Sequence, residues 1–309
     1  MSNPWDSEFP ITETLVHKLL ACQFPQLKPL QISRLGQGWD NAAFLVNQCY
    51  VFRFPQREIA APAILIENRV LPCLAPILPL NIPLPIFHGD PQDPFPWPFS
   101  DYEILPGILA CSARLADSQR EACARPLGHF LKSLHLATAK LPAGILPVDP
   151  FGRCDTHKTH TRLATYLEKA ESHLSPSFKT ALDRVLKNPP RFNLRRDCVV
   201  HGDLYVRHLL VTEQRNLAGV IDWGDCVLAD PGVDLAIAWT FLPPSAQAAF
   251  LEAYGPVAPD SWSYASLFGA FYGMVLSHFG QETCDEDLLF EGRQILRYWE
   301  TYSRTAPWT

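Results

Sequence analysis

Two kinds of hydrophobic pattern divide the chain. Near the N-terminus, four apolar residues recur at helical spacing behind Thr12, which is suited to cap a helix: Leu15, Val16, Leu19 and Leu20. Three segments then alternate between apolar and polar residues or run apolar, as strands do: LQISRLG (30–36), AAFLV (42–46) and YVFRF (50–54). We therefore expect a helix followed by a β-meander.

The next stretch predicts one more helix and two more strands. A helical pattern covers residues 58–71, and the segments PLPIF (83–87) and DYEIL (101–105) have the character of short strands. Residues 71–87 are apolar but contain five prolines, which would break a membrane helix repeatedly, so we expect a stiff, extended connection there. Five strands and one interposed helix predict a small α+β lobe.

From Gly107 onward the pattern becomes mainly helical. Helical spacing of apolar residues covers 127–136, and LFGAFYGMVL (267–276) predicts a buried helix because it is far shorter than the ~20 residues that cross a bilayer. Three short strand-like runs interrupt the helices: VVHGDL (199–204), HLLVT (208–212) and LAGVID (217–222). The sequence therefore predicts two lobes, residues 1–106 and residues 107–309.

The last two of these runs predict a hairpin that brings ionisable residues together. If Thr212 pairs with Leu217, counting back along the antiparallel strands puts His208 opposite the residue before Asp222. Asp203 lies on the loop that enters the same hairpin. Because burying an unpaired charge costs several kcal/mol, this segment must open onto a solvated or metal-bearing site.

Composition and charge restrict the partners. The formal net charge is −6 and no long Lys/Arg run occurs, so we expect neither nucleic acid nor an acidic membrane as partner, and small-molecule chemistry becomes the default. Nine cysteines without a C-x-x-C pair are typical of reduced thiols in the cytoplasm. The polar N-terminus MSNPWDSEFP lacks the pattern of a signal peptide, so we expect a cytoplasmic protein. The oligomeric state stays open.

The segments HGDL (201–204) and VIDWGDCVLADPGVDLA (220–236) resemble the aminoglycoside phosphotransferase family, whose fold is similar to that of protein kinases. The resemblance covers most of the chain and includes, in the same order, GQGWDNAAFLV (36–46), YVFRFP (50–55), DYEILPG (101–107) and LKSLHLA (131–137). It implies a two-lobed, protein-kinase-like α+β fold with a small N-terminal β-sheet lobe and a mainly helical C-terminal lobe. It also implies a phosphotransferase with an alcohol group as acceptor.

The resemblance assigns the chemistry of the C-terminal lobe to three residues. Asp203 would orient the acceptor hydroxyl and receive its proton, and Asp222 would hold the Mg²⁺ that bridges the nucleotide phosphates. The family usually has asparagine where this chain has His208, but its macrolide phosphotransferase branch has a histidine there. His208 is therefore expected to be a metal ligand, binding Mg²⁺ or Mn²⁺ as neutral imidazole.

The N-terminal lobe would bind ATP or GTP. The backbone of the Gly36 and Gly38 hairpin would cradle the phosphates, with Asn41 in a left-handed position where a third glycine might stand. In the segment that links the lobes, the resemblance implies nucleotide contacts at Glu103 and Ile104.

A basic residue of the third strand completes the expected nucleotide site. Arg53 stands where kinases have the phosphate-pairing lysine, and Glu67 on the following helix is its expected partner. Arg57 and Glu58 are the rivals for the two places. An arginine in this position again resembles the macrolide branch, and its guanidinium suits two phosphate oxygens.

Three other polar residues are expected to support the site. His201 would orient the catalytic loop, and Asp234 would act as a cap or in a salt bridge. His135 lies on an apolar helix, where a hydrogen-bonded core histidine is expected.

Three hypotheses about function follow. The leading one is a kinase that phosphorylates a hydroxyl of a small molecule, with antibiotics among the candidates. The departures at Arg53 and His208 leave open a catalytically silent, kinase-fold ligand-binding protein. A metallohydrolase that uses His201, Asp203, His208 and Asp222 would explain the central cluster but would leave the N-terminal hairpin and Glu67 without a role.

The acceptor stays open between two chemistries. The acidic segment QETCDEDLLFEG (281–292) suits the ammonium groups of an aminoglycoside, with a solvated helix start as the alternative. SYASLFGAFYG (263–273) suits the apolar cleft of a macrolide site, with a packed core as the alternative.

Overall fold

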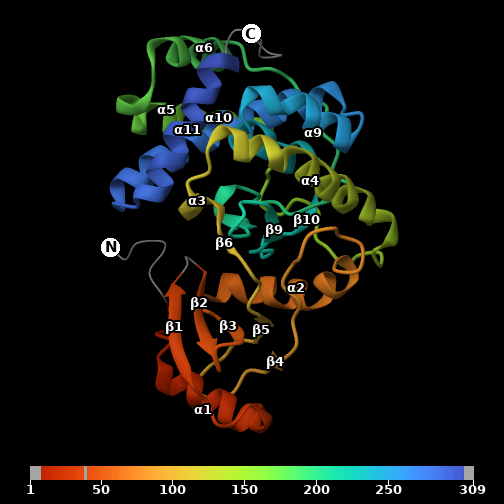
Figure 1. Ribbon diagram of the computed structural model, residues 1–309, viewed down its shortest axis with the longest axis vertical. Helices are drawn as coiled ribbons and strands as arrows, with labels where there is room; N and C mark the ends of the chain where they lie inside the picture. Colours follow the sequence, from red (N-terminus) through yellow and green to blue (C-terminus); the bar gives the residue numbers. More distant parts are fainter. Residues whose placement is uncertain (1–7, 38–39, 303–309) are drawn as a thin grey trace. The chain divides into compact units, whose positions relative to one another are not determined.

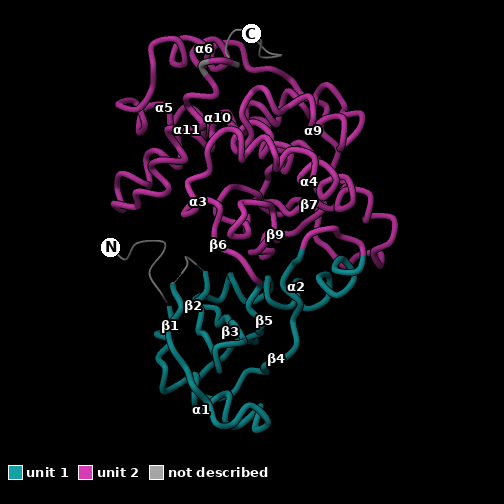
Figure 2. The backbone as a smooth tube through the Cα atoms, in the orientation of Figure 1, with its two compact units in different colours: residues 1–76, 81–105 teal, residues 77–80, 106–309 magenta. Residues whose placement is uncertain are grey.

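A computed structural model describes residues 8–37 and 40–302 of the chain (Figure 1). The chain divides into two units, drawn in different colours in Figure 2. The first comprises the residues up to Pro76 together with Asn81–Leu105, and the second comprises Ile77–Leu80 and the chain from Pro106 onward.

A five-stranded antiparallel sheet forms the centre of the first unit. Its strand order is β1-β2-β3-β5-β4, and two α-helices accompany it. The bounds are α1 (Glu13–Gln23), β1 (Ile32–Gln37), β2 (Asn41–Val46), β3 (Tyr50–Pro55), α2 (Ala61–Leu74), β4 (His88–Gly89) and β5 (Phe99–Glu103). The Thr12 side chain accepts a hydrogen bond from the amide of Leu15 at 3.2 Å, so the expected cap, helix and meander are confirmed.

Phenylalanine rings fill the core of this unit. Alternate residues of β2 are buried, as its pattern predicts. Its Phe44 belongs to one buried cluster with Phe52 and Phe54 of β3 and with Phe99 of β5. The rings of Phe54 and Phe99 are stacked, with centroids 4.7 Å apart. Because each buried aromatic ring removes a large apolar area from water, this cluster fixes the register of the sheet.

Two expectations for the first unit are wrong. PLPIF is not a strand, because Pro83 and Pro85 have no amide to donate to a ladder, and β4 begins only at His88. The helix also does not stop at residue 71: α2 continues through Pro72 to Leu74.

The second unit is mainly helical. Its helices are α3 (Ala110–Ala113), α4 (Asp117–Leu136), α5 (Thr156–Lys169), α6 (Pro176–Lys187), α7 (Gly232–Leu235), α8 (Ile237–Thr240), α9 (Gln247–Tyr254), α10 (Pro259–Glu282) and α11 (Glu286–Tyr302). Residues 267–276 lie within α10 and most of them are buried, as expected. Helix α11 packs along α10 so closely that a Cβ at Gly292 would lie 2.4 Å from the amide nitrogen of Ser277.

Two small sheets interrupt these helices. One has the order β6-β8-β9 and consists of β6 (Ile108–Leu109), β8 (Leu209–Val211) and β9 (Leu217–Val220). The other pairs β7 (Cys198–Val200) with β10 (Val227–Ala229). A 3₁₀ turn, η5 (Val206–His208), leads into β8. The three strand-like runs of the sequence are therefore all strands, although shorter than their patterns.

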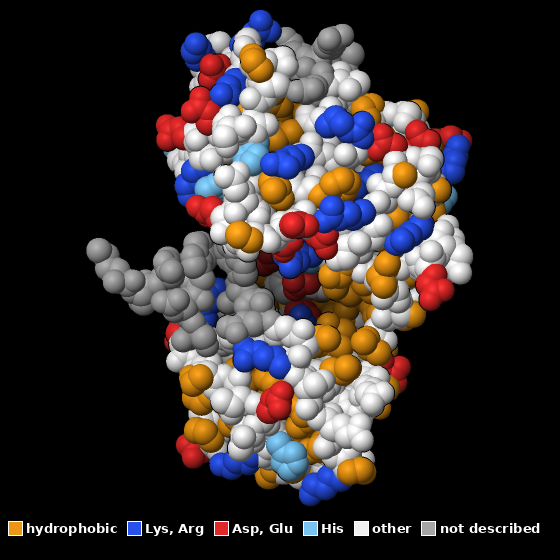
Figure 3. Space-filling model, turned by 60° about the vertical axis from the view of Figure 1, so that its left-hand side comes forward, with side chains coloured by type: hydrophobic (Ala, Val, Ile, Leu, Met, Phe, Trp, Pro, Cys, Tyr) orange, Lys and Arg blue, Asp and Glu red, His pale blue; other side chains and the backbone are white. Residues whose placement is uncertain are grey.

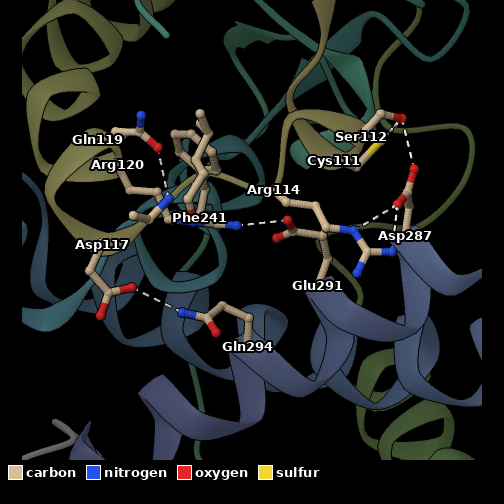
Figure 4. A network of polar contacts seen from close by, with 12 residues as sticks. Cys111, Ser112, Arg114, Asp117, Gln119, Arg120, Phe241, Asp287, Glu291 and Gln294 are labelled. Carbon is tan, nitrogen blue, oxygen red and sulfur yellow. Dashed lines mark hydrogen bonds and ion pairs between the residues drawn. The ribbon is translucent and has the colours of Figure 1, made fainter.

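A buried ion pair ties α4 to α11 (Figure 4). Arg120 Nη2 donates to Glu291 Oε1 at 2.6 Å, and both side chains are fully buried. The other nitrogens of Arg120 donate to the carbonyls of Leu115 and Phe241. Replacing either residue by an uncharged one would leave the other charge buried and unpaired. Each such substitution would lower the free energy of unfolding by about 3–5 kcal/mol. The pair therefore holds α11 against α4.

The described residues contain neither a helix suited to span a membrane nor a disulfide. Among the helices of the described ranges, none combines the length and the apolar character that crossing a bilayer requires. All nine cysteines are free thiols.

Asp101 is a buried carboxyl in the first unit. Its Oδ1 accepts the amides of Ile86 (3.2 Å) and Phe87 (2.7 Å), whereas Oδ2 is buried without a hydrogen-bond partner in the described part of the chain. Burial raises the pKa of Asp101 to about 6, against the lowering effect of the two amides. The folded protein therefore binds a proton that the unfolded chain releases near pH 4.

We predict that Asp101→Asn removes this pH dependence. In the parent, Asp101 makes the first unit less stable as pH rises from about 4 to about 6, because its pKa is higher folded than unfolded. The variant should gain ~2–3 kcal/mol relative to the parent over that interval and retain the Oδ1 acceptor. Hydrogen exchange of the β3 and β5 amides at several pH values measures the gain. Glu103→Gln, on the exposed end of β5, is the control; a constant difference between Asp101→Asn and the parent would contradict the assignment.

Candidate active site

One buried carboxylate holds the start of the HGDL loop. Asp234 on α7 accepts the amides of His201 (2.7 Å, Oδ2) and Gly202 (2.9 Å, Oδ1). His135 Nε2 donates to Asp234 Oδ2 at 3.2 Å, and Tyr254 donates its hydroxyl to His135 Nδ1 at 2.8 Å. Burial alone would raise the pKa of Asp234, but the bonds from His135 and the amides lower it overall. Asp234 therefore anchors the loop as a carboxylate, and His135 is the hydrogen-bonded core histidine that the sequence predicts.

The loop turns at a position that only glycine can occupy. Gly202 has φ +87°, and a Cβ there would lie 2.2 Å from the backbone oxygen of Asp225. The turn directs the next residue, Asp203, out of the core, and the Asp203 side chain is 34% exposed.

His201 links this loop to the end of β9. Its Nε2 donates to the carbonyl of Ile221 at 3.0 Å, and its Nδ1 accepts the amide of Asp203 at 3.3 Å. The ring is buried against Trp223, with centroids 4.7 Å apart, and burial lowers the pKa of His201. His201 is therefore a neutral spacer whose two nitrogens are both occupied, as expected for an orienting residue. Because neither nitrogen is available to a metal, the metallohydrolase hypothesis loses one of its four ligands.

The hairpin has the register expected around the ionisable residues, although one pairing was wrong. A bulge pairs Val211 with Leu217, so the expected pair of Thr212 with Leu217 is off by one residue. Nearer the site the count recovers, and the amide of Ile221 donates to the carbonyl of His208 at 2.9 Å. His208 therefore lies opposite Ile221, as predicted.

His208 contacts both aspartates of the candidate site. Its Nδ1 donates to the carbonyl of Asp203 at 2.7 Å, and its Nε2 lies 3.2 Å from Oδ2 of Asp222. Burial would lower the pKa of His208, but the carboxylates, Asp222 above all, raise it to about 9. Without a metal the imidazole is therefore protonated at neutral pH, in contrast to the neutral form expected of a ligand, and a metal ion would have to displace that proton.

The donor set fits a weakly held divalent cation. Within residues 8–37 and 40–302, no group of three or more His, Cys, Asp or Glu side chains is arranged to hold a metal. Asp222, whose side chain is 55% exposed, and His208 Nε2 are two adjacent donors. Mg²⁺ is commonly bound by one or two protein ligands and completed by phosphates and water. The carbonyl contact at Nδ1 leaves Nε2 as the ligating nitrogen.

The sequence patterns did not predict two side chains that contact Asp203 and Asp225. Tyr272 on α10 donates its hydroxyl to Asp203 Oδ1 at 2.6 Å. Arg153 Nη2 lies 2.5 Å from Oδ2 of Asp225. Burial would lower the pKa of Arg153, but the charges of Asp225 and Asp203 raise it. These contacts join residues 69 and 72 positions apart. No local pattern announces them: Tyr272 belongs to a segment interpreted only as core or cleft lining.

In the first unit, Arg53 and Glu67 form a buried ion pair. Arg53 lies on β3 and Glu67 on α2, so the expected pairing is confirmed. Of the rivals, Arg57 pairs with Asp40, and Glu58 lies before α2, at the start of a 3₁₀ turn. The pair fixes a guanidinium on the sheet.

The glycine hairpin is only partly as expected. Gly36 is exposed at an irregularity of β1, and a Cβ there would meet nothing within 4 Å. Gly38 lies outside the described residues. Asn41 does not take a left-handed conformation: it is the first residue of β2 and pairs with Pro55, because the ladder already begins there. The open space over Gly36 leaves its backbone accessible.

The two residues of the linking segment that are expected to contact nucleotide, Glu103 and Ile104, are the last residue of β5 and the one after it. Glu103 pairs with Tyr50, and the amide of Ile104 donates to the carbonyl of Cys49 at 2.7 Å. That amide is therefore engaged within the sheet. Antiparallel alternation turns the backbone groups of Glu103 away from β3.

The acidic segment 281–292 is largely paired within the protein. Its carboxylates face basic partners: Glu282 with His278 (3.3 Å), Asp285 with Arg207 (3.3 Å) and Asp287 with Arg114 (3.0 Å). Asp285 also accepts the amide of Leu288 at the start of α11. On the face drawn in Figure 3, Lys and Arg side chains of the described residues lie interspersed with Asp and Glu. The helix-start interpretation therefore fits better than a concentrated cation site.

Comparison with known proteins gives related results at three levels. Residues 31–266 match the model of the phosphotransferase enzyme family. The chain is 26% identical over 93 residues to the uncharacterized protein YcbJ of Bacillus subtilis (strain 168), and this match spans 29% of the chain and only 30% of that relative.

Two solved structures resemble the whole fold. A variant of aminoglycoside 2'-phosphotransferase-IIIa in complex with GDP has a TM-score of 0.66 at 24% identity, covering 96% of this chain and 100% of that one. Macrolide 2'-phosphotransferase MphH from Brachybacterium faecium, as apoenzyme, has a TM-score of 0.55 at 19% identity, covering 86% and 91%. With the antiparallel sheet and the helical second unit, these likenesses confirm the expected protein-kinase-like α+β fold.

We predict that Asp234→Asn destabilises the second unit by about 3 kcal/mol, because an amide cannot accept from His135 and both loop amides at once. The amides of His201 and Gly202 should lose hydrogen-exchange protection. Asp260→Asn is the matched control, since Asp260 accepts a single amide, that of Asn193, near the surface. Calorimetry of the two variants and the parent gives the comparison. Equal, small losses would show that Asp234 does not anchor the loop.

Proposed function

This chain belongs to the phosphotransferase enzyme family, and on that premise we propose that it transfers the γ-phosphoryl group of ATP or GTP to a hydroxyl of a small molecule. One observation carries the proposal. The Asp203 carboxylate and the adjacent His208 and Asp222 pair lie on one loop and hairpin, and His208 contacts both aspartates. A base and a cation site side by side are what phosphoryl transfer requires of a protein.

Asp203 acts as the base in this proposal. The acceptor hydroxyl oxygen forms a bond to the γ-phosphorus as the bond from phosphorus to the β,γ-bridging oxygen breaks. The hydroxyl proton passes to Asp203, and the nucleoside diphosphate leaves with the bridging oxygen. The 34% exposure of the Asp203 side chain gives a hydroxyl access to it.

His208 and Asp222 would hold Mg²⁺, or Mn²⁺ in its place. When bound, the ion neutralises phosphate charge. The chain contributes the orientation of the ligands: the Asp203 carbonyl fixes the imidazole through Nδ1. The left-handed backbone of Asp222, with φ +65°, directs its exposed carboxylate.

The first unit would supply the nucleotide contacts. The Arg53 guanidinium, held by Glu67, is suited to phosphate oxygens, and the accessible backbone at Gly36 is suited to close approach by phosphate. The backbone of Glu103 is suited to hydrogen bonds with the nucleobase of the nucleotide. Ile104 would contribute its exposed side chain instead, because its amide already donates within the sheet.

Antibiotic alcohols are the first acceptors to test, because the similar structures include both aminoglycoside and macrolide phosphotransferases. The chain's own residues favour neither class. The acidic segment is paired with basic side chains, and most of residues 263–273 form packed core.

The proposal is tested by incubating the chain with γ-labelled ATP or GTP and Mg²⁺ in the presence of aminoglycosides, macrolides and small polyols. We expect a labelled phosphate ester with at least one of these acceptors. Nucleotide binding without transfer to any acceptor or to water would instead support the silent ligand-binding hypothesis.

We predict that Asp203→Asn lowers turnover by a factor of about 100 or more and leaves nucleotide affinity nearly unchanged, because the carboxylate acts on the acceptor and not on the nucleotide. Asp197→Asn is the control, since Asp197 is a largely exposed aspartate before the same loop. Turnover with the labelled nucleotide and equilibrium binding are measured on all three proteins. Parent-like turnover of Asp203→Asn would exclude Asp203 as the base.

A further inference from the structure

Tyr272 joins a long buried helix to the carboxylate of Asp203. Its hydroxyl lies 2.6 Å from Oδ1 of Asp203, and the Tyr272 side chain is buried, whereas that of Asp203 is 34% exposed. Hydrogen bonds to an ionised acceptor are about twice as strong as neutral ones. The contact therefore ties a loop side chain to α10.

This hydrogen bond has one direction. A carboxylate oxygen only accepts, and burial together with the nearby charge of Asp203 raises the pKa of Tyr272 well above its usual value, so the phenol keeps its proton. Oδ1 of Asp203 is thus occupied. Oδ2 lies 3.8 Å from His208 Nδ1, whose proton is directed to the Asp203 carbonyl instead. The two oxygens of one carboxylate are therefore in different situations.

Tyr272 is itself held in place by rings. Tyr205 stacks on it, with centroids 5.7 Å apart and planes at 24°, and Phe268 meets its edge at 5.2 Å. Tyr205 also contacts His208, with ring centroids 4.5 Å apart in an edge-to-face arrangement. A packed aromatic wall therefore connects the proposed base to the proposed metal ligand.

We propose that Tyr272 is a positioning residue for phosphoryl transfer: it fixes one carboxylate oxygen of Asp203, so that the other is presented to the acceptor hydroxyl. The inference rests on the proposed function, because it takes Asp203 as the base. Tyr272 acts through Asp203. A purely structural tyrosine would contribute to stability but not to the rate of the chemical step.

The chain offers a matched control for that distinction. Tyr298 on α11 is also buried, and it donates its hydroxyl to Asp117 Oδ1 at the same 2.6 Å. Tyr272→Phe and Tyr298→Phe each remove one phenol hydroxyl from one aspartate and keep the ring. They differ in which aspartate loses a donor, and Asp117 keeps the bonds from Arg297 and Gln294.

Kinetics separate a positioning role from a purely structural one. They are measured with γ-labelled nucleotide, Mg²⁺ and an acceptor that the parent phosphorylates, or with water as the acceptor. Tyr272→Phe should lower kcat about 10- to 100-fold with the KM for nucleotide unchanged, because a misplaced reacting group costs rate rather than nucleotide binding. Tyr298→Phe should keep the parent's kcat. In an Asp203→Asn background, Tyr272→Phe should cause no further loss, since the group that it positions is gone.

Crystal structures of the parent and Tyr272→Phe give a readout that does not depend on turnover. The Asp203 carboxylate should take one orientation in the parent and a different or mixed one in the variant. If the carboxylate stays in place and kcat is unchanged, the inference is wrong even though the proposed function stands. If the parent transfers phosphate to nothing, the proposed function fails, and the orientation of Asp203 still decides whether Tyr272 positions it.

Discussion

The amides of His201 and Gly202 share one buried carboxylate, that of Asp234, and the geometry of the candidate site depends on this contact. A loop that leaves a strand has backbone donors to satisfy, and a buried anion satisfies two of them at once. His135 donates a further hydrogen bond to the same carboxylate. With the loop held in this way, the left-handed turn at Gly202 can direct Asp203 outward.

The same short segment also contains the two proposed metal ligands. His201 connects the loop to the end of β9 through its bond to the Ile221 carbonyl. His208 connects the same loop to Asp222, because it contacts both the Asp203 carbonyl and the Asp222 carboxylate. The proposed base and the proposed metal ligands thus share a scaffold of strand ends and buried rings. This economy explains why so many ionisable residues fall between positions 201 and 222.

The sequence predicted what is local. Helical spacing predicted α1, the short apolar run 267–276 predicted the buried helix found within α10, and strand patterns predicted the meander. Hairpin counting placed His208 opposite Ile221 despite a bulge that shifted the pairing of Thr212. Contacts between distant segments could not be read in this way. Tyr272 bonds to Asp203, which lies 69 positions away in the sequence. The packing of α10 in its unit determines where the Tyr272 hydroxyl lies, and a local pattern does not report that packing. Asn41 was misjudged because ladder pairing overrides the conformational preference of a single residue.

We propose that His208 and Asp222 form a cation site next to Asp203. Mn²⁺ reports directly on its ligands, so pulsed electron paramagnetic resonance of the protein with Mn²⁺ and a nucleoside diphosphate tests the claim. The parent should show nitrogen modulation from a coordinated imidazole that disappears in His208→Ala and persists in His278→Ala, which changes a histidine paired with Glu282. Identical spectra from the parent and His208→Ala would contradict it.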